Sequence, residues 1–369
     1  MRVLGFMSGT SLDAVDMAVV ETDGERVLAL GPAGERKLPE DLRRLSLEAT
    51  ARAQAWREGE PEPEVFAPLA TAVAEFQAEA ALAFLAANGL GPTDIDAAGF
   101  HGQTLLHERP SGGRRGRSIQ VGDAALLARR LGVPVVYELR RADTEAGGQG
   151  APLAPAYHAA LAAFAGLRPP LAVLNLGGVG NLTFIDADGS LTAFDTGPAN
   201  GPLDQWVERH GRGRFDEGGR LAAAGRADEA RIAQWLARPY FERFGPKSLD
   251  RYEFTPDLVQ DLSLEDGAAT LAAFSAACIA HAVGQAPRAP ERLIVCGGGR
   301  RNRAIMDELR RRVPTPVFTA EDAGWRGDSI EAEAWAFLAA RSLKGLPITW
   351  PTTTGAPHPL TGGKVVEPC

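Results

Sequence analysis

The chain carries short apolar runs that are separated by loops of small residues and by tight turns. Near the N-terminus, apolar runs at residues 3–6, 15–20 and 27–30 are separated by a small-residue loop and then by the pair Asp23-Gly24. A short apolar run bounded by turn residues is typical of a β-strand, and an Asp-Gly pair between two such runs predicts a hairpin. This region therefore predicts strand, loop, strand, tight turn and strand.

The same order recurs in the middle of the chain. Apolar runs at residues 171–174, 182–185 and 191–194 are separated by a glycine loop at 177–180 and by an Asp-Gly turn at 188–189. Two copies of one pattern, about half a chain apart, predict a duplicated domain.

Further strands and helices are predicted between and beyond the two repeats. The helical stretches have apolar residues three or four positions apart, and their alternation with strands predicts the α/β class. The tail from residue 347 is predicted to lie over the first domain. The additional strands are expected at residues 95–100, 118–121, 133–137 and 293–296, and the helices at 39–57, 65–87, 124–131, 203–210, 222–235, 267–283, 304–312 and 330–343.

The composition is that of a globular protein and narrows the range of partners. The 369 residues are 45% hydrophobic and 23% charged, which suits two domains of ordinary size. The net charge of -8 argues against nucleic acid or an anionic membrane, because such partners need a positive field. The three cysteines share no CxxC spacing, so neither a disulfide framework nor a zinc site is predicted. No signal peptide or spanning run is evident, so we expect a cytoplasmic protein.

Glycine loops after apolar runs indicate a close approach of the backbone to a ligand. Residues 297–299 are three glycines between a predicted strand and a predicted helix, which suits contact with phosphate or ribose. A Walker loop is absent, and residues 178–180 give only half of a dinucleotide fingerprint because Thr183 stands at the third glycine position. HExxH and GxSxG do not occur either, which weakens the metalloprotease and esterase interpretations.

Polar residues beside the predicted strands are candidates for chemistry. Asp195 follows a strand and precedes a helix, so it is either placed for catalysis or caps the helix near Asn200. His101 is either a core histidine or, together with Gln103 and Thr104, part of the wall of a polar pocket.

Two loops leave similar alternatives open. Asp123 is placed to cap the helix at 124–131, and contact with a ligand is an equal alternative. Lys247 and Arg251 belong to a basic loop that is either plain surface or a phosphate contact. The glycine cluster at 147–150 is predicted to be both a hinge and a ligand loop, and we place the domain boundary there.

Eight ordered motifs give the chain a specific resemblance. They are MSGTSLDAVD (7–16), HGQT (101–104), QVGD (120–123), GGQGAPL (147–153), LNLGGVGNL (174–182), DTGPAN (195–200), PKS (246–248) and CGGGRRN (296–302). In this order they resemble the anhydro-N-acetylmuramic acid kinase family, within the actin-like, sugar-kinase and heat-shock ATPase superfamily. The resemblance implies an α/β fold of two duplicated ribonuclease H-like (actin-like ATPase) domains with an interdomain cleft. We expect the first domain at 1–145 plus about 345–369, and the second at 146–344.

The resemblance also implies a reaction and the residues that perform it. ATP would phosphorylate the 6-oxygen of an anhydro amino sugar while water opens the 1,6-anhydro bond, giving N-acetylmuramic acid 6-phosphate in peptidoglycan recycling. Asp195 would be the general base on water, and Mg²⁺ would be held mainly by ATP oxygens and water, with no direct protein ligand. The implied partners are the sugar and ATP, and the resemblance is compatible with a homodimer. The implied ATP-binding residues are Gly9, Thr10, Ser11, Leu12, Asp13, Ala14, Val15, Asp16, Gly177, Gly178, Asn181, Gly297, Gly298, Gly299 and Asn302, and the implied substrate-binding residues are His101, Gln103, Thr104, Gln120, Asp123, Arg140, Asp143 and Gln149.

Four positions depart from the residues that are usual in the family. Ala14 and Ala199 replace glycines, and an added methyl group is tolerated unless the backbone needs a positive φ. Glu138 and Leu139 replace an aspartate-phenylalanine pair, which affects the expected sugar contacts more than the reaction type.

Two other functions remain compatible with the glycine loops. One is an actin- or chaperone-like ATPase that acts as a binding module, and the other is an ordinary hexose kinase in which Asp195 deprotonates a sugar hydroxyl. The polar cluster that includes His101, Arg140, Asp143 and Gln149 favours a kinase, because a filament or a chaperone needs no small polar pocket.

Overall fold

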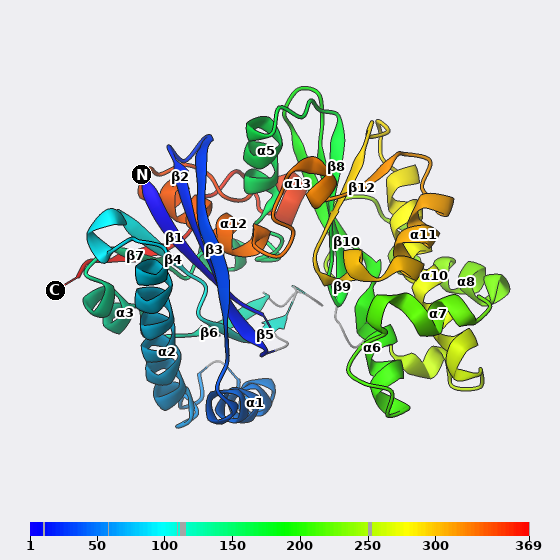
Figure 1. Cartoon of the computed structure of the whole chain (residues 1–369), viewed down its shortest axis with the longest axis horizontal. Helices are drawn as coiled ribbons and strands as arrows, with labels where there is room; N and C mark the ends of the chain where they lie inside the picture. Colours follow the sequence, from blue (N-terminus) through cyan, green and yellow to red (C-terminus); the bar gives the residue numbers. More distant parts are fainter. Residues whose placement is uncertain (10–11, 58, 109, 111–115, 250–252, 369) are drawn as a thin grey trace. The chain divides into compact units, whose positions relative to one another are not determined.

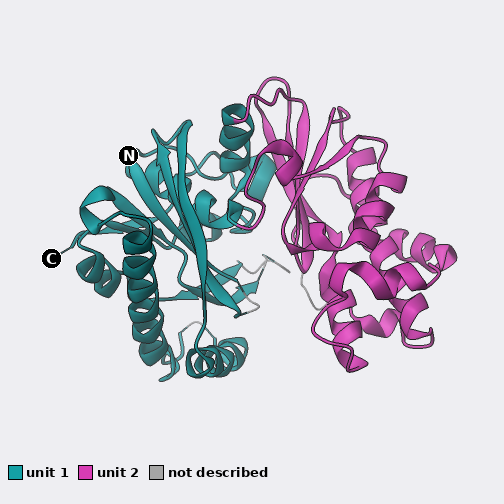
Figure 2. Cartoon of the chain, viewed as in Figure 1, with its two compact units in different colours: residues 1–164, 329–369 teal, residues 165–328 magenta. Residues whose placement is uncertain are grey.

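The chain forms two compact units, which are considered one at a time. The structure is a computed structural model that describes residues 1–9, 12–57, 59–108, 110, 116–249 and 253–368. Unit 1 is Met1–Phe164 with Ser329–Cys369, and unit 2 is Ala165–Asp328 (Figure 2).

Unit 1 is built on a six-stranded mixed sheet. Its strands are β1 (Arg2–Ser8), β2 (Ala14–Thr22), β3 (Val27–Lys37), β4 (Ala97–Phe100), β7 (Val135–Tyr137) and β13 (Lys364–Val366), and β5 (Gln103–Glu108) pairs separately with β6 (Arg117–Val121). The order is β13-β7-β4-β1-β2-β3 (Figure 1). β1, β2 and β3 form an antiparallel meander, whereas β4 runs parallel to β1 and β7 runs parallel to β4.

Helices cover the sheet of unit 1. They are α1 (Glu40–Ala55), α2 (Phe66–Ala87), α3 (Ala124–Leu131), α4 (Arg141–Glu145), α5 (Pro155–Phe164), α12 (Ile330–Leu343) and α13 (Pro351–Thr354), with a 3₁₀ turn at Pro92–Asp94. Gly5 of β1 and Gly99 of β4 are directly paired. A Cβ on these glycines would overlap the carbonyl oxygens of Ala332 and Trp335 in α12. Glycine at both positions therefore lets α12 lie close against the sheet.

Unit 2 is built on a five-stranded mixed sheet. Its strands are β8 (Leu171–Leu176), β9 (Val179–Ile185), β10 (Leu191–Pro198), β11 (Leu293–Cys296) and β12 (Val317–Thr319), in the order β10-β9-β8-β11-β12. β8, β9 and β10 form an antiparallel meander, and β11 and β12 run parallel to β8 and β11 respectively.

The two sheets share one topology. In each, the third strand of a meander is at one edge, followed by the second and first strands and then by two parallel strands. The predicted repeat of strand, loop, strand, turn and strand is therefore confirmed, as is the α/β class. Unit 1 differs by its additional edge strand β13, which belongs to the C-terminal tail.

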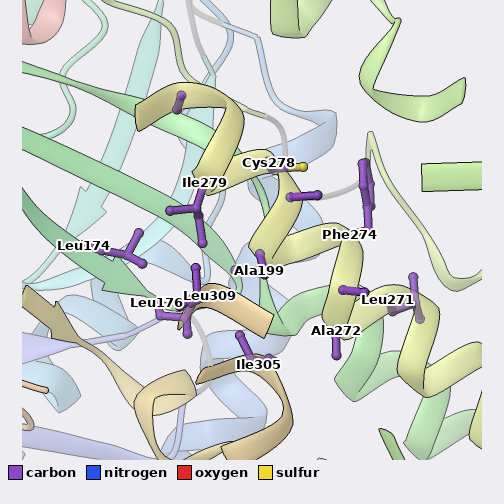
Figure 3. Close-up of a cluster of buried hydrophobic side chains, with 14 of the residues drawn as sticks. Leu174, Leu176, Ala199, Leu271, Ala272, Phe274, Cys278, Ile279, Ile305 and Leu309 are labelled. Atoms are coloured by element: carbon purple, nitrogen blue, oxygen red, sulfur yellow. The ribbon is translucent and has the colours of Figure 1, made fainter. Parts of the chain in front are cut away.

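The core of unit 2 lies between its sheet and the long helix α10. The helices of this unit are α6 (Asn200–Arg209), α7 (Arg220–Ala224), α8 (Glu229–Leu236), α9 (Pro239–Glu242), α10 (Leu264–Gly284) and α11 (Arg303–Arg312), with 3₁₀ turns at Glu217–Gly219, Pro256–Val259, Gly298–Arg301 and Glu321–Ala323. Leu174 and Leu176 of β8, Ile279 of α10, and Ile305 and Leu309 of α11 belong to one buried cluster (Figure 3).

Some predicted element bounds are wrong, each for a local reason. The helix predicted at 222–235 is two helices, because Gly225 lies against the backbone at Glu265 and Asp228 starts the second helix by accepting a hydrogen bond from Arg231 N. The helix predicted at 203–210 begins earlier, at Asn200. β3 and β10 extend several residues beyond the predicted strands.

The units divide the chain at other positions than the sequence suggested. Helices α5 and α12 group with unit 1, and so does the glycine cluster at 147–150 that was predicted to be a hinge. The reason is packing: α12 lies on β1, β2 and β4, and α5 packs against α12. The tail also belongs to unit 1, through the pairing of β13 with β7. The division into two folding domains stays a prediction.

Two helices are long and apolar enough to cross a membrane by length and composition alone. They are α2 and α10, and 50% and 83% of their most apolar windows are buried within the fold. Burial of this extent is typical of core helices, since α10 contributes most of its side chains to the core of unit 2.

Candidate active site

In unit 2, the glycine turn between β8 and β9 is held against the start of α6. The carbonyl oxygen of Gly177 accepts a hydrogen bond from Asn200 N (2.9 Å), and that of Gly178 accepts one from Ala199 N (3.1 Å). The Asn200 side chain donates to the carbonyl oxygen of Leu176 (3.0 Å). The glycine loop at 177–180 is therefore hydrogen-bonded to the N-terminus of α6. Asn200 was not predicted to take part in this contact.

The triple-glycine loop lies beside this turn. β11 runs parallel to β8, so both strands end at the same edge of the sheet. A Cβ on Gly299 would lie 2.6 Å from Asn200 Nδ2, and Gly297 has a φ of 77° and faces the Asn175 side chain. Gly298 is exposed, and an added Cβ would meet no atom within 4 Å. The structure thus places the glycine loop at 177–180 beside the triple-glycine loop at 297–299.

Arg300 holds the triple-glycine loop in place. Its side chain is only 5% exposed and pairs with Glu321 (2.7 Å) and Asp328 (2.9 Å). It also donates to the carbonyl oxygen of Gly297 (2.9 Å). Asn302, predicted to bind ATP, caps α11 by accepting a hydrogen bond from Ile305 N (3.2 Å). Its amide oxygen therefore has a structural role.

Asp195 lies inside β10 and is held on several sides. A β-bulge separates Asp195 from Gly197, and such bulges re-aim side chains near functional sites. Asn181 Nδ2 donates to Asp195 Oδ1 (2.9 Å), and Leu249 N donates to Oδ2 (2.8 Å). The Tyr240 hydroxyl donates to the Asp195 carbonyl oxygen (2.6 Å). Both carboxylate oxygens are thus oriented by neutral donors.

The alternative in which Asp195 caps a helix is wrong. The N-cap of α6 is Ala199, which makes no side-chain hydrogen bond. The carboxylate of Asp195 contacts Asn181 and Leu249 instead. Asn181, predicted from the resemblance to bind ATP, lies directly beside Asp195.

In unit 1, the loop that follows β1 is hydrogen-bonded to Gln103. Ser8 Oγ donates to Gln103 Oε1 (2.7 Å), and Gln103 Nε2 approaches the carbonyl oxygen of Gly9 (3.4 Å). Leu12 and Val15 are buried, so their side chains face the interior and only their backbone is available to a nucleotide. Asp13 is exposed, Ala14 and Asp16 are partly buried, and the predicted contacts Thr10 and Ser11 lie outside the described residues.

His101 is a buried, neutral imidazole within a polar cluster. Burial, and then the charge of Arg140, lowers the pKa of His101 to about 3. His101 Nδ1 lies 3.0 Å from the carbonyl oxygen of Gly102, so Nδ1 carries the proton. Nε2 then accepts from the Thr104 hydroxyl (3.3 Å), and Gln120 Nε2 donates to the His101 carbonyl oxygen (3.1 Å).

Arg140 joins this cluster through Trp335 of α12. The Arg140 guanidinium lies 5.4 Å from the centre of the Trp335 ring, and the His101 ring lies 4.7 Å from the same ring. Arg140 Nη1 also donates to the carbonyl oxygen of Gly150 (2.8 Å). Burial lowers the pKa of Arg140 to about 10, which leaves it protonated at neutral pH. Four predicted sugar contacts, His101, Thr104, Gln120 and Arg140, therefore lie together.

Asp143, a predicted sugar contact, is buried and forms hydrogen bonds within unit 1. It is 1% exposed, and its oxygens accept from Thr354 Oγ1 (2.6 Å) and Gly150 N (2.6 Å). Gln149 N donates to the Thr354 carbonyl oxygen (2.8 Å), so Asp143 organises the loop that carries Gln149. Asp123 caps α3 by accepting from Leu126 N (2.8 Å).

The positions that depart from the family pattern differ in backbone strain. Ala14 is in an extended strand and Ala199 has a φ of -127°, so neither has the positive φ that favours glycine. Glu138 has a φ of 53°, which side chains rarely adopt. Its carboxylate pairs with Lys364 of β13 (2.9 Å) and Arg141 (3.2 Å). The tail therefore helps to hold the turn before Arg140.

Sequence reasoning missed the residues that orient the predicted ones. Tyr240, Leu249, Trp335 and Thr354 contact site residues from distant parts of the chain, and no local pattern marks them. The PKS motif around Lys247 was the one available signal. Lys247 is 4% exposed, so it is not plain surface, and Arg251 lies outside the described residues.

No group of three or more His, Cys, Asp or Glu side chains in residues 1–9, 12–57, 59–108, 110, 116–249 and 253–368 is placed to hold an ion.

Two sheets of one topology, each with a glycine-containing loop in its first hairpin, define the actin-like, sugar-kinase and heat-shock ATPase class of fold. The sequence model of the family described as anhydro-N-acetylmuramic acid kinase matches residues 1–368. The chain belongs to this family.

Individual relatives agree over the full length. The anhydro-N-acetylmuramic acid kinase of Phenylobacterium zucineum is 56% identical over 368 residues, which cover 100% of each chain. The protein of the same name from Caulobacter vibrioides is 58% identical over 366 residues, or 99% of each chain. Among solved structures, (R)-2-hydroxyglutaryl-CoA dehydratase component A of Acidaminococcus fermentans is 13% identical, with a TM-score of 0.46 over 92% of this chain and 99% of that one. That likeness is too slight to add to the argument.

Proposed function

We propose that this chain is an ATP-dependent kinase that opens 1,6-anhydro-N-acetylmuramic acid and phosphorylates it to N-acetylmuramic acid 6-phosphate. The observation that carries the proposal is the full-length match to relatives named for this activity, at 56% and 58% identity. The product is a cell-wall amino sugar, so the reaction belongs to peptidoglycan recycling, and we place the enzyme in the cytoplasm.

Asp195 is the proposed general base. It takes a proton from the water molecule that attacks the anomeric carbon, the bond from this carbon to the 6-oxygen breaks, and the 6-oxygen takes the γ-phosphoryl group of ATP, leaving ADP. The hydrogen bonds from Asn181 and Leu249 N to the carboxylate support this role, because they fix its direction.

The glycine loops are the proposed nucleotide contacts. Gly177, Gly178 and Gly298 present bare backbone at one edge of the sheet of unit 2, which suits approach by phosphate or adenosine. Gly9 has the same role in unit 1. Magnesium, brought by the nucleotide, would neutralise charge on the transferring phosphoryl group.

The polar cluster of unit 1 is the proposed sugar site. The neutral His101 offers no charge to compete with Arg140, which is the cation available for an acidic sugar. Gln149 and Gln120 supply amide groups for hydroxyl or acetamido contacts.

The test is a coupled assay of ADP release with three acceptors: the anhydro-sugar, glucose and N-acetylglucosamine. We expect turnover with the anhydro-sugar and a phosphorylated, ring-opened product by mass spectrometry. The Asp195→Asn variant should lose about 100-fold to 10,000-fold in turnover while keeping its ATP affinity. Turnover of glucose alone would favour an ordinary hexose kinase, and ATP hydrolysis without an acceptor would favour an ATPase binding module.

A further inference from the structure

We propose that Lys247 is a positioning residue for Asp195, acting through the segment of residues 240–249. The inference rests on the proposed function, in which Asp195 is the base. Three hydrogen bonds to Asp195 come from this segment: the Tyr240 hydroxyl donates to the Asp195 carbonyl oxygen (2.6 Å), Leu249 N donates to Oδ2 (2.8 Å), and the Lys247 carbonyl oxygen accepts from Asp195 N (2.9 Å).

The Lys247 side chain forms hydrogen bonds within the segment of residues 240–249. Its Nζ donates to the carbonyl oxygens of Tyr240 (3.0 Å) and Arg243 (2.6 Å). The ammonium lies 4.6 Å from the centre of the Tyr240 ring and 5.4 Å from that of Phe194, the residue before Asp195 in β10. One buried cation therefore contacts α9, the following loop and β10, the strand that carries Asp195.

Burial of an ammonium group costs desolvation free energy, so its presence in this loop argues for a role beyond packing. Burial, and then the charge of Arg243, lowers the pKa of Lys247 to about 8, while Cys278 and Asp195 oppose that shift. An apolar residue would fill the same space without this desolvation cost. Only an ammonium supplies both donors for the two carbonyl oxygens and an opposite charge near Asp195.

Loss of the ammonium should therefore act on the chemical step. Without it, the carbonyl oxygens of Tyr240 and Arg243 lose their donor, and the Tyr240 hydroxyl and Leu249 N shift relative to Asp195. Small displacements of a catalytic group reduce rates by up to about 100-fold. The nearby positive charge also favours the ionised carboxylate. We expect Lys247→Met to lower kcat by roughly 10-fold to 100-fold with little change in either KM, and to move the acid limb of the kcat profile to higher pH.

The experiment compares four variants with the parent enzyme in the coupled assay, from about pH 5 to pH 9. Lys247→Met keeps an unbranched side chain of nearly the same length and removes its charge. Tyr240→Phe removes only the hydroxyl, Asp195→Asn removes the base, and Lys344→Met, at an exposed lysine after α12, is the control for loss of a lysine. Near-ultraviolet circular dichroism and calorimetric ATP binding check that each variant is folded.

The results separate the inference from the function on which it rests. An inactive Asp195→Asn together with a Lys247→Met of parental kcat and unshifted acid limb would overturn the inference alone, as would a Lys247→Met that raises KM and leaves kcat unchanged. An Asp195→Asn of parental turnover would overturn the proposed base itself. If Lys247→Met does not fold, Tyr240→Phe decides: reduced kcat at constant KM supports the inference, and parental kcat rejects it.

Discussion

The three consecutive glycines at 297–299 have different reasons to lack a side chain. Gly297 combines a positive φ with a close approach to Asn175, and Gly299 fits against Leu176. Gly298 has open space around it and no positive φ. Among the described residues of unit 2, none restricts position 298 to glycine, which suits the proposed contact with ATP.

Gly298→Val should consequently fold normally and bind ATP poorly. A branched side chain would occupy the space in which the backbone meets the nucleotide, and we expect a loss of affinity of at least about tenfold, or roughly 1.4 kcal/mol, by calorimetry. Gly284→Val is the matched control, because Gly284 at the end of α10 is also exposed and open. Unchanged affinity in Gly298→Val would remove this loop from the nucleotide site.

At single positions, the sequence pointed to candidate site residues but not to the residues that surround them. Asp195 and its proposed role were identified from motif and resemblance, but its donors Tyr240 and Leu249 lie 45 and 54 residues further along the chain. For Asp143, a predicted sugar contact, the sequence did not reveal the hydrogen bond from Thr354, which is 211 residues away. Partners so distant are fixed by tertiary packing, which leaves no local signal.

Among the elements, the loop at 147–150 depends on the short helix α13. Asp143 accepts hydrogen bonds from both, through Gly150 N and Thr354 Oγ1. Gln149 is tied to α13 by its backbone N–H. The tail of the chain therefore sets the position of a proposed sugar contact.

Thr354→Val tests this connection with a change of similar shape. The substitution leaves a buried carboxylate oxygen without its hydroxyl donor, which should destabilise the fold by about 1–3 kcal/mol. It should also raise KM for the sugar more than KM for ATP. Thr352→Val on the exposed side of α13 is the control. Equal effects on both KM values would argue against a specific link to the sugar site.

Strands were easier to predict than the interruptions in helices. The runs that form β1, β2, β8, β9 and β11 are apolar and bounded by glycine or an Asp-Gly turn, so local sequence suffices. The break between α7 and α8 arises because Gly225 lies against α10. The bulge after Asp195 depends on the pairing of β10 with β9. Both features are set by a neighbouring element.

At the scale of the whole molecule, the repeated strand order was predictable from the sequence because both copies have the same turn residues. The unit boundaries were not, since helix α12 follows the residues of unit 2 in the chain yet packs on the sheet of unit 1. Gly5 and Gly99 permit this close packing of α12. They are 94 residues apart, and no local sequence pattern shows that they contact the same helix.

Unit 1 also carries two buried imidazoles, which should make its stability depend on acid. Burial lowers the pKa of His101 to about 3, with Arg140 adding to the shift, and burial lowers that of His158 to about 4. Both values lie below the roughly 6.5 expected for an unfolded chain. The unfolded chain thus binds more protons than the folded one between these values, so this contribution is full above about pH 6.5 and is lost as pH falls toward 4.

His158→Gln should therefore flatten the fall in stability between about pH 6.5 and pH 4. Each imidazole that stays neutral in the fold adds up to about 1.4 kcal/mol per pH unit to the slope, so removing that of His158 should lower the slope by up to about that amount. The measurement is the free energy of unfolding in urea at half-unit steps of pH, followed by tryptophan fluorescence. His358→Gln is the control for the loss of a histidine, since His358 is exposed in the same unit. A slope in His158→Gln equal to that of the parent would mean that His158 takes up its proton without opening the fold.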